Sequence, residues 1–116
     1  MNREIIELKT FTKAVKKAKI NPSIIDNLKK DLLENPEKGD IIKGTSGLRK
    51  IRVPIDGKGK RGGARVIYYY YVVNEIIYLS YLYKKADEIN INNNMKKYIV
   101  DYIKEIKEGK RNEDNG

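Results

Sequence analysis

The chain has 116 residues, a length that suits one domain with a modest core of two packed layers. It contains neither cysteine nor histidine, which excludes disulfides, thiolate metal sites and histidine acid–base catalysis. Any catalysis must therefore use Lys, Arg, Tyr, Asp or Glu. The sequence shows no signal peptide and no apolar run long enough to span a membrane, so we expect a soluble cytoplasmic protein.

The net charge of +9 is concentrated in one segment of the chain. Residues 43–65 contain eight basic residues and one acid, a net charge of +7 (8 − 1). Residues 1–42 carry +2 (9 − 7), and residues 66–116 carry no net charge (8 − 8). Positive charge gathered in this way indicates a polyanionic partner, whereas an even spread would indicate only solubility.

A strand followed by two helices is predicted in the first third of the chain. Residues 3–11 alternate loosely and predict the strand, and residues 12–19 predict a short basic helix capped by its threonine. Asn21-Pro22 then has the pattern of a helix N-cap followed by a proline in the first turn. This second helix should end at Asn35, because the proline that follows disfavours a helical conformation in the residue before it.

The remainder of the chain has the pattern of three strands and a closing helix. Residues 48–53 predict a short strand, and residues 64–73 predict a longer one rich in β-branched and aromatic side chains. Residues 76–83 predict a third strand that pairs with it as a hairpin. The glycine-rich residues 55–63 predict a loop, and residues 95–106 place apolar side chains at helical spacing.

These elements predict an α+β domain, with a small antiparallel sheet of three to four strands, two N-terminal helices and one C-terminal helix. We expect residues 1–108 to form this single domain and residues 109–116 to form a polar, frayed tail. The sequence shows no internal repeat and no second domain.

The basic segment and the end of the last strand supply candidates for a functional site. Lys50 and Arg52 are two residues apart on one strand and so project from the same face, and Arg65 begins the next strand. If these strands pair, the three cations converge. The loop and the third strand add further cations and one aromatic ring, Lys58, Lys60, Arg61, Tyr83, Lys84 and Lys85. Cations with an aromatic ring at their edge are typical of single-stranded RNA binding.

Two motifs in this region have simpler explanations. Residues 57–61 lack the spacing of a phosphate-binding Walker loop, and no Ser or Thr follows their lysines. Basic loops of this kind are often only solvated. The tyrosine run at residues 68–71 favours strand packing over base stacking, because alternate rings point to opposite faces of a sheet.

Three blocks within residues 22–90 resemble the HigB branch of the RelE toxin superfamily, namely residues 36–53, 57–69 and 82–85. The most specific are Gly-Leu-Arg-Lys-Ile-Arg and Gly-Lys-Arg-Gly-Gly-Ala-Arg-Val-Ile-Tyr-Tyr. The resemblance implies a small antiparallel sheet flanked by helices and ribosome-dependent cleavage of messenger RNA without metal or cofactor. It also implies contact with 16S ribosomal RNA, a cognate helix-turn-helix antitoxin, and DNA binding only through the antitoxin complex. One departure is Ala86-Asp87, where the family usually has Asn-Glu, which affects the role of that amide rather than the fold.

Metal-free RNA cleavage requires the ribose 2′-oxygen to attack the adjacent phosphate, so cations must stabilise the extra negative charge. We expect Arg52 and Arg65 to clamp the phosphate with bidentate guanidinium groups, and Tyr83 to stack on a base or position the nucleophile. Like charge lowers the pKa of an ammonium group, so a lysine inside the cluster is a candidate base. The candidates are Lys50, Lys60 and Lys85, among which the sequence does not choose. The residues predicted to bind RNA without reacting are Arg49, Lys58, Arg61 and Lys84.

Three alternative functions fit the same residues. The basic patch can belong to a non-catalytic module that only grips RNA or DNA. It can also belong to a degenerate toxin that binds its antitoxin without cleaving RNA, as the departure at Ala86 allows. A protein–protein adaptor is the third, and it predicts little salt dependence of binding where the patch predicts a steep one.

Overall fold

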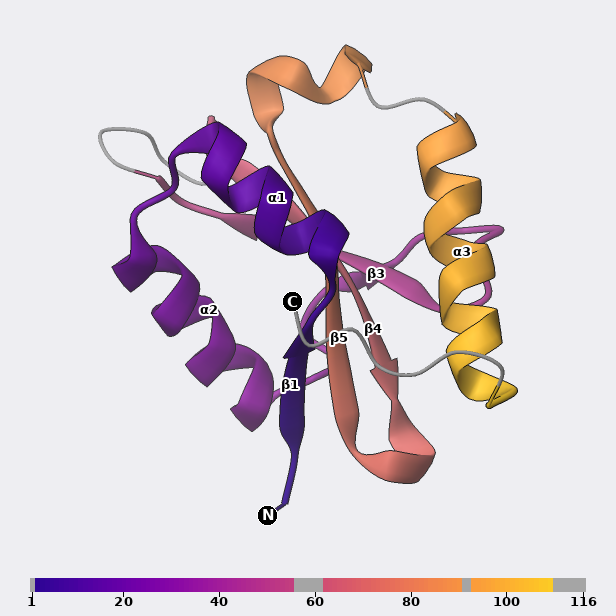
Figure 1. The fold of residues 1–116 in the computed structure, drawn as a ribbon. Helices are drawn as coiled ribbons and strands as arrows, with labels where there is room; N and C mark the ends of the chain where they lie inside the picture. Colours follow the sequence, from indigo (N-terminus) through magenta and orange to yellow (C-terminus); the bar gives the residue numbers. More distant parts are fainter. Residues whose placement is uncertain (1, 56–61, 91–92, 110–116) are drawn as a thin grey trace.

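The structure is a computed structural model, and it describes residues 2–55, 62–90 and 93–109. In this part of the chain a sheet of five strands is flanked by three α-helices, which confirms the predicted α+β class (Figure 1). The elements are β1 (Glu4–Glu7), α1 (Lys9–Ala18), α2 (Pro22–Glu34), β2 (Asp40–Ile41), β3 (Leu48–Val53), β4 (Ala64–Tyr71), β5 (Ile76–Lys84) and α3 (Asn93–Lys107), with short 3₁₀ turns at Val72–Asn74 and Lys85–Asn90. None of the described helices is long and apolar enough to cross a membrane.

The strand order is β1-β5-β4-β3-β2, and the sheet is mixed rather than wholly antiparallel. Strands β2 to β5 pair antiparallel, but β1 runs parallel to β5, with Glu4 opposite Ile76. The sheet therefore has one strand more than the prediction allowed. The additional strand is β2, whose two residues are too short a run to show an alternating pattern.

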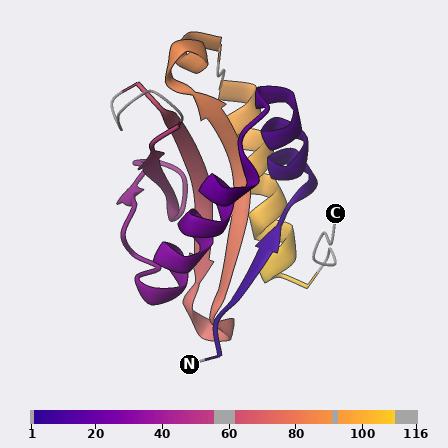
Figure 2. The same ribbon diagram turned by 90° about the vertical axis from the view of Figure 1, so that its left-hand side faces the viewer.

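Both faces of the sheet are covered, α1 and α2 lying on one face and α3 on the other (Figures 1 and 2). Tyr68 and Tyr70 of β4 pack among the residues under α1 and α2, whereas Tyr69 and Tyr71 pack among those under α3. The tyrosine run thus serves strand packing, as predicted. Tyr68 and Tyr69 are buried core side chains, whereas Tyr70 and Tyr71 are half-buried and pack against the same two cores.

The predicted limits of α2 are correct, but those of α1 are not. The Asn21 side chain accepts a hydrogen bond of 2.9 Å from the Ser23 N–H and caps α2, which ends at Glu34. Helix α1 begins three residues before the expected Thr12, so that Phe11 lies in the helix and not in the first strand. Its ring is fully buried in the core between the helices and the sheet, and burial of a whole aromatic side chain outweighs a weak local strand preference.

Candidate active site

Three residues that the sequence predicted for chemistry lie in one row across three neighbouring strands. Arg52 of β3 is directly opposite Arg65 of β4, and Arg65 is directly opposite Tyr83 of β5. Residues directly opposite in a sheet project from the same face, with Cβ atoms about 4.5–5.5 Å apart. This row, which we call the Arg52–Arg65–Tyr83 row, faces the α3 side of the sheet, since Tyr83 packs in the core under α3.

A β-bulge decides which face of the sheet Tyr83 takes. Ile67 is opposite Tyr81 but Tyr68 is opposite Leu79, so Ser80 is an extra residue in β5. Before the bulge Leu79 faces α1 and α2; after it Tyr83, four residues on, faces α3. Unbroken alternation would put both on one face, so the bulge brings the tyrosine beside Arg65.

The row combines one buried and one exposed guanidinium group. Arg65 is only 5% exposed and donates a hydrogen bond of 3.1 Å to the carbonyl oxygen of Ala64. Arg52 is exposed, and its guanidinium makes no hydrogen bond or ion pair with the described part of the chain. Like charges directly opposite each other in a sheet are destabilising. The two guanidinium groups therefore repel each other, and an anion bound between them would reduce that repulsion.

A cleft of about 760 Å³ lies between α2 and the edge of β3. Strand β2 pairs with Arg49 and Lys50, and the following residues of β3, Ile51, Arg52 and Val53, line the cleft. Its charged lining comprises Lys38, Lys50, Arg52, Arg65 and Lys85, with Asp31 and Asp40 as the acids. Asp31 is paired with Lys38 at 3.1 Å. The cleft is thus predominantly cationic, and its volume lies within the roughly 300–1,000 Å³ of small-ligand sites.

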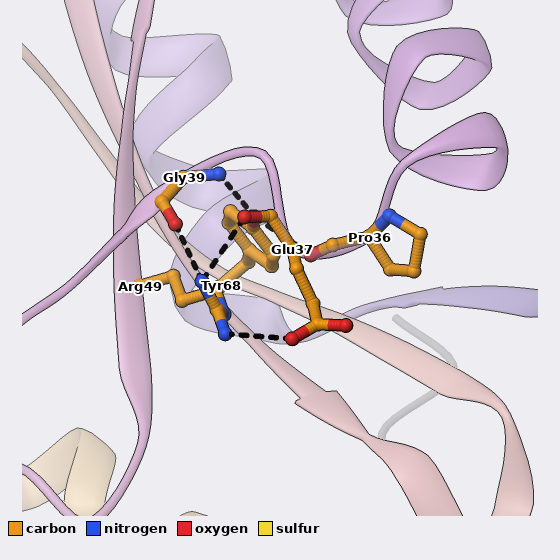
Figure 3. A network of polar contacts seen from close by, with 5 residues as sticks. All are labelled: Pro36, Glu37, Gly39, Arg49 and Tyr68. Atoms are coloured by element: carbon orange, nitrogen blue, oxygen red, sulfur yellow. Dashed lines mark hydrogen bonds and ion pairs between the residues drawn. The ribbon is translucent and has the colours of Figure 1, made fainter.

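The wall of this cleft is fixed by a polar network around Arg49, which Figure 3 shows. Arg49 donates hydrogen bonds to the carbonyl oxygens of Gly39 at 2.7 Å and Glu37 at 3.1 Å, and its guanidinium lies 3.4 Å from a Glu37 carboxylate oxygen. Arg49 was predicted to bind RNA, and the structure shows that its guanidinium has partners within the chain. Its guanidinium ties the segment before β2 to β3, because that segment supplies the only carbonyl groups it contacts among the described residues.

Tyr68 completes the network from the buried side (Figure 3). Its hydroxyl donates to the carbonyl oxygen of Pro36 at 2.8 Å and accepts from the Gly39 N–H at 2.8 Å. Burial raises the pKa of Tyr68 above its ordinary value. A Cβ atom at Gly39 would lie 2.9 Å from this hydroxyl, so only glycine allows the close approach. We call Pro36, Glu37, Gly39, Arg49 and Tyr68 the latch, because together they hold the segment that carries Lys38 and Asp40 into the cleft.

Comparison with known proteins matches nearly the whole chain to one family. A family described as the RelE toxin of the RelE / RelB toxin–antitoxin system matches residues 3–114. The chain belongs to the RelE toxin family. Among solved structures, the chain is similar to the free state of the toxin RelE of E. coli, in a variant with two arginines replaced by alanine. The TM-score is 0.56 and the sequence identity is 18%. The match covers 89% of this chain and 99% of that one, and at this identity it concerns the fold.

The remaining predicted residues of this RelE-family toxin fall into three groups. Lys50 and Lys85 are exposed and line the cleft together with the arginines of the row. Lys84 is opposite Ala64, one position from the Arg65–Tyr83 pair, and so projects from the other face of the sheet. Lys58, Lys60 and Arg61 lie outside the described residues. The row and the cleft thus bring together five of the residues predicted for chemistry, whereas Lys84 and Arg49 project from the other face of the sheet.

Sequence reasoning missed two residues that line the toxin's cleft, Lys38 and Asp40. Asp40 lies opposite Lys50 in the β2–β3 pair, and Lys38 precedes that pair by two residues. The strand that places them has only two residues, so no periodic pattern revealed it. The usable signal was the resemblance of residues 36–53 to the family, which begins before β2 and includes both positions.

Proposed function

We propose that this toxin is a metal-independent endoribonuclease that cleaves messenger RNA on the ribosome and so stops translation. The observation that carries the proposal is the Arg52–Arg65–Tyr83 row beside a cationic cleft. Membership of the RelE family supports the toxin role and an antitoxin partner. The row adds a place where a phosphate can be held between two guanidinium groups next to an aromatic ring.

The reaction that fits these residues is transesterification within the RNA backbone. The ribose 2′-oxygen forms a bond to the adjacent phosphorus while the bond from phosphorus to the 5′-oxygen breaks. A base takes the 2′-hydroxyl proton, and a proton must reach the leaving 5′-oxygen. The products are a 2′,3′-cyclic phosphate and a 5′-hydroxyl end, and no oxidant or further reactant is consumed.

Each residue of the row has a role that its placement supports. Arg65 is buried and fixed by the sheet, so its charge acts on the developing phosphorane with little reorganisation. Arg52 is exposed and can close on the phosphate from solvent. Tyr83 is only 7% exposed, which favours positioning of the ribose or the phosphate over stacking on a base. Lys50 and Lys85 are candidates for the base, together with Lys60 outside the described residues.

Two finer parts of the proposal concern partners. The antitoxin would carry a helix-turn-helix domain and would take the toxin to DNA only within their complex. On the ribosome the toxin would contact 16S ribosomal RNA, which would orient the message. A site made of cations and one tyrosine lacks a strong base, and orientation of the reacting groups by a scaffold can lower the barrier by as much as about 7–11 kcal/mol.

The test is induction of the gene in a bacterial host, with primer extension on a reporter message. We expect growth arrest and cleavages within translated codons, and both should be lost in Arg65→Ala. Cleavage products with 2′,3′-cyclic phosphate ends would support the transesterification. Growth without arrest on an intact message would instead favour a non-catalytic RNA-binding protein or a degenerate toxin. A fully toxic, folded Arg65→Ala variant would show that the row is not the site.

A further inference from the structure

Helix α1 carries a second group of cations that the candidate active site does not use. At 100° per residue its lysines fall within an arc of about 100° on one side of the helix. They are Lys9, Lys13, Lys16 and Lys17, all of which are exposed. The opposite arc holds the side chains that pack against the sheet, Phe11, Ala14, Val15 and Ala18. We call these four lysines the α1 stripe.

The acidic residue nearest to the α1 stripe in the sequence is Glu7, which precedes the helix and forms an ion pair with Lys29 of α2. Residues 8–25 contain five lysines, the fifth being Lys19 after the helix, and neither Asp nor Glu. Lys13, Lys16 and Lys17 make no ion pair or side-chain hydrogen bond with the described part of the chain. The helix dipole attracts lysines only within the last turn of a helix. It therefore accounts for the positions of Lys16 and Lys17 but not for those of Lys9 and Lys13.

The α1 stripe is separate from the candidate active site. Helix α1 covers the face of the sheet opposite to the one from which the Arg52–Arg65–Tyr83 row projects. Its lysines point away from the sheet, because the other side of the helix is buried against it. No lysine of the stripe lines the cleft. A substrate held at the row therefore does not account for this charge.

We propose that the α1 stripe binds the phosphate backbone of double-stranded RNA. This inference rests on the proposed function, since a toxin that works on the ribosome needs a hold on structured RNA besides its grip on the message. A helix of this length is about 15 Å long and can follow several phosphates of a duplex. Lysine ammonium groups serve as point charges toward phosphates and require no base sequence.

An acidic protein partner is the other class that fits positive charge, and the surface favours RNA over it. Protein interfaces are depleted in lysine and centre on buried apolar or aromatic anchors. The large exposed apolar side chains of the described residues all lie outside α1, at Leu33, Ile41, Val72, Val73 and Tyr98. The outward side of α1 thus offers charge alone, which is what a phosphate backbone requires.

The experiment compares two triple variants of the full chain that lose the same charge. One is Lys13→Gln/Lys16→Gln/Lys17→Gln on the stripe. The matched control is Lys30→Gln/Lys97→Gln/Lys104→Gln, which replaces exposed lysines of α2 and α3. Glutamine and lysine have similar helix propensities, so thermal melts should show that both variants fold. Binding to a short blunt-ended RNA duplex is measured by fluorescence anisotropy at several salt concentrations.

We expect the stripe variant to bind the duplex at least about tenfold more weakly, with the salt slope reduced by about two to three, near one per lysine removed. The control should keep most of its affinity and slope. Equal losses in both variants, or no loss in the stripe variant, would overturn the proposal. Normal duplex binding by a stripe variant that no longer captures the antitoxin would also overturn it, in favour of a protein partner.

Failure of the proposed function leaves a different signature. Arg65→Ala should lose cleavage in the induced host and keep wild-type binding to the duplex, because Arg65 projects from the other face of the sheet. If the wild-type protein fails to cleave messages, the endoribonuclease proposal falls. The duplex titration of the two triple variants still decides the role of the α1 stripe in that case.

Discussion

Arginines at the two ends of β3 have opposite surroundings. Arg49 is tied by hydrogen bonds to the carbonyl groups of residues 37 and 39, and it lies on the side of the strand toward the latch. Arg52, three residues further on, faces Arg65 and contacts no carboxylate in the described part of the chain. A guanidinium with partners of its own stabilises the fold. One that is placed opposite another cation is repelled by it and can attract an anion, and this difference separates the latch from the candidate active site.

The largest effect is expected for Arg65→Ala, which removes the buried member of the row. Loss of one fixed charge at a developing oxyanion typically lowers the rate about 100- to 1,000-fold, and we expect a loss at least this large. Quantitative primer extension after induction measures it. Arg65→Lys is the control, since it keeps the charge and loses the bidentate fork, and it should fall between wild type and alanine. Activity of the lysine variant at or below the alanine level would show that charge is not what the site needs.

The contrast between the two arginines of β3 can be tested directly. Arg52→Ala should lower cleavage roughly tenfold or more and leave the melting temperature unchanged or raised, because it relieves repulsion with Arg65. Arg49→Ala should instead lower stability by about 1.5–3 kcal/mol, since it removes hydrogen bonds from a charged donor. Urea unfolding measures the stability of each variant, and primer extension measures its cleavage of the message. A reversed pattern would show that the latch and the site have been assigned to the wrong arginines.

A smaller effect is expected for Tyr68→Phe, which removes only the hydroxyl at the centre of the latch. The variant leaves the Gly39 N–H and the Pro36 carbonyl oxygen without this partner, at a cost of about 1–3 kcal/mol. Urea unfolding measures the loss, and Tyr69→Phe is the matched control on β4, since the hydroxyl of this buried tyrosine makes no hydrogen bond with the described part of the chain. Similar losses in both variants would mean that the hydroxyl of Tyr68 has no special role.

The smallest effect is a dependence of stability on alkaline pH. Burial raises the pKa of Tyr68, so the native state keeps its proton when the unfolded chain begins to lose it near pH 10. This contribution is therefore complete below about pH 10 and is lost as the pH rises above it. The stability difference between wild type and Tyr68→Phe should shrink between about pH 8 and about pH 11. A constant difference across this range in denaturant titrations would contradict the assignment.

The alternation of side chains along β3 already indicated that Arg49 and Arg52 lie on different faces of the sheet. Residues 49 and 52 have opposite parity on a six-residue strand, so they project from opposite faces. The same rule that grouped Lys50 with Arg52 thus places Arg49 apart from them. The path of residues 36–39 decides what Arg49 contacts. This path follows from hydrogen bonds with Tyr68, which is distant in the chain, so no pattern in the local sequence predicts it.

Several features of this RelE-family toxin were determined by the sequence alone. Proline and asparagine fix the ends of α2, and the limits of β3 follow from its own residues. The sequence likewise shows the concentration of positive charge between residues 43 and 65. The lack of histidine and cysteine limits the candidate catalytic residues to other side-chain types. These features depend on neighbours in the chain, and local sterics, capping and composition decide them.

Only the tertiary structure decided which of these residues meet. The direction of β1, the two-residue β2 and the start of α1 depend on the elements they pack against. The clearest case is Tyr83, since a single extra residue at Ser80 reverses its face and completes the row with Arg65. A strand's register is set by the pairing of distant segments and by burial on both faces, so the sequence of β5 by itself could not have shown it.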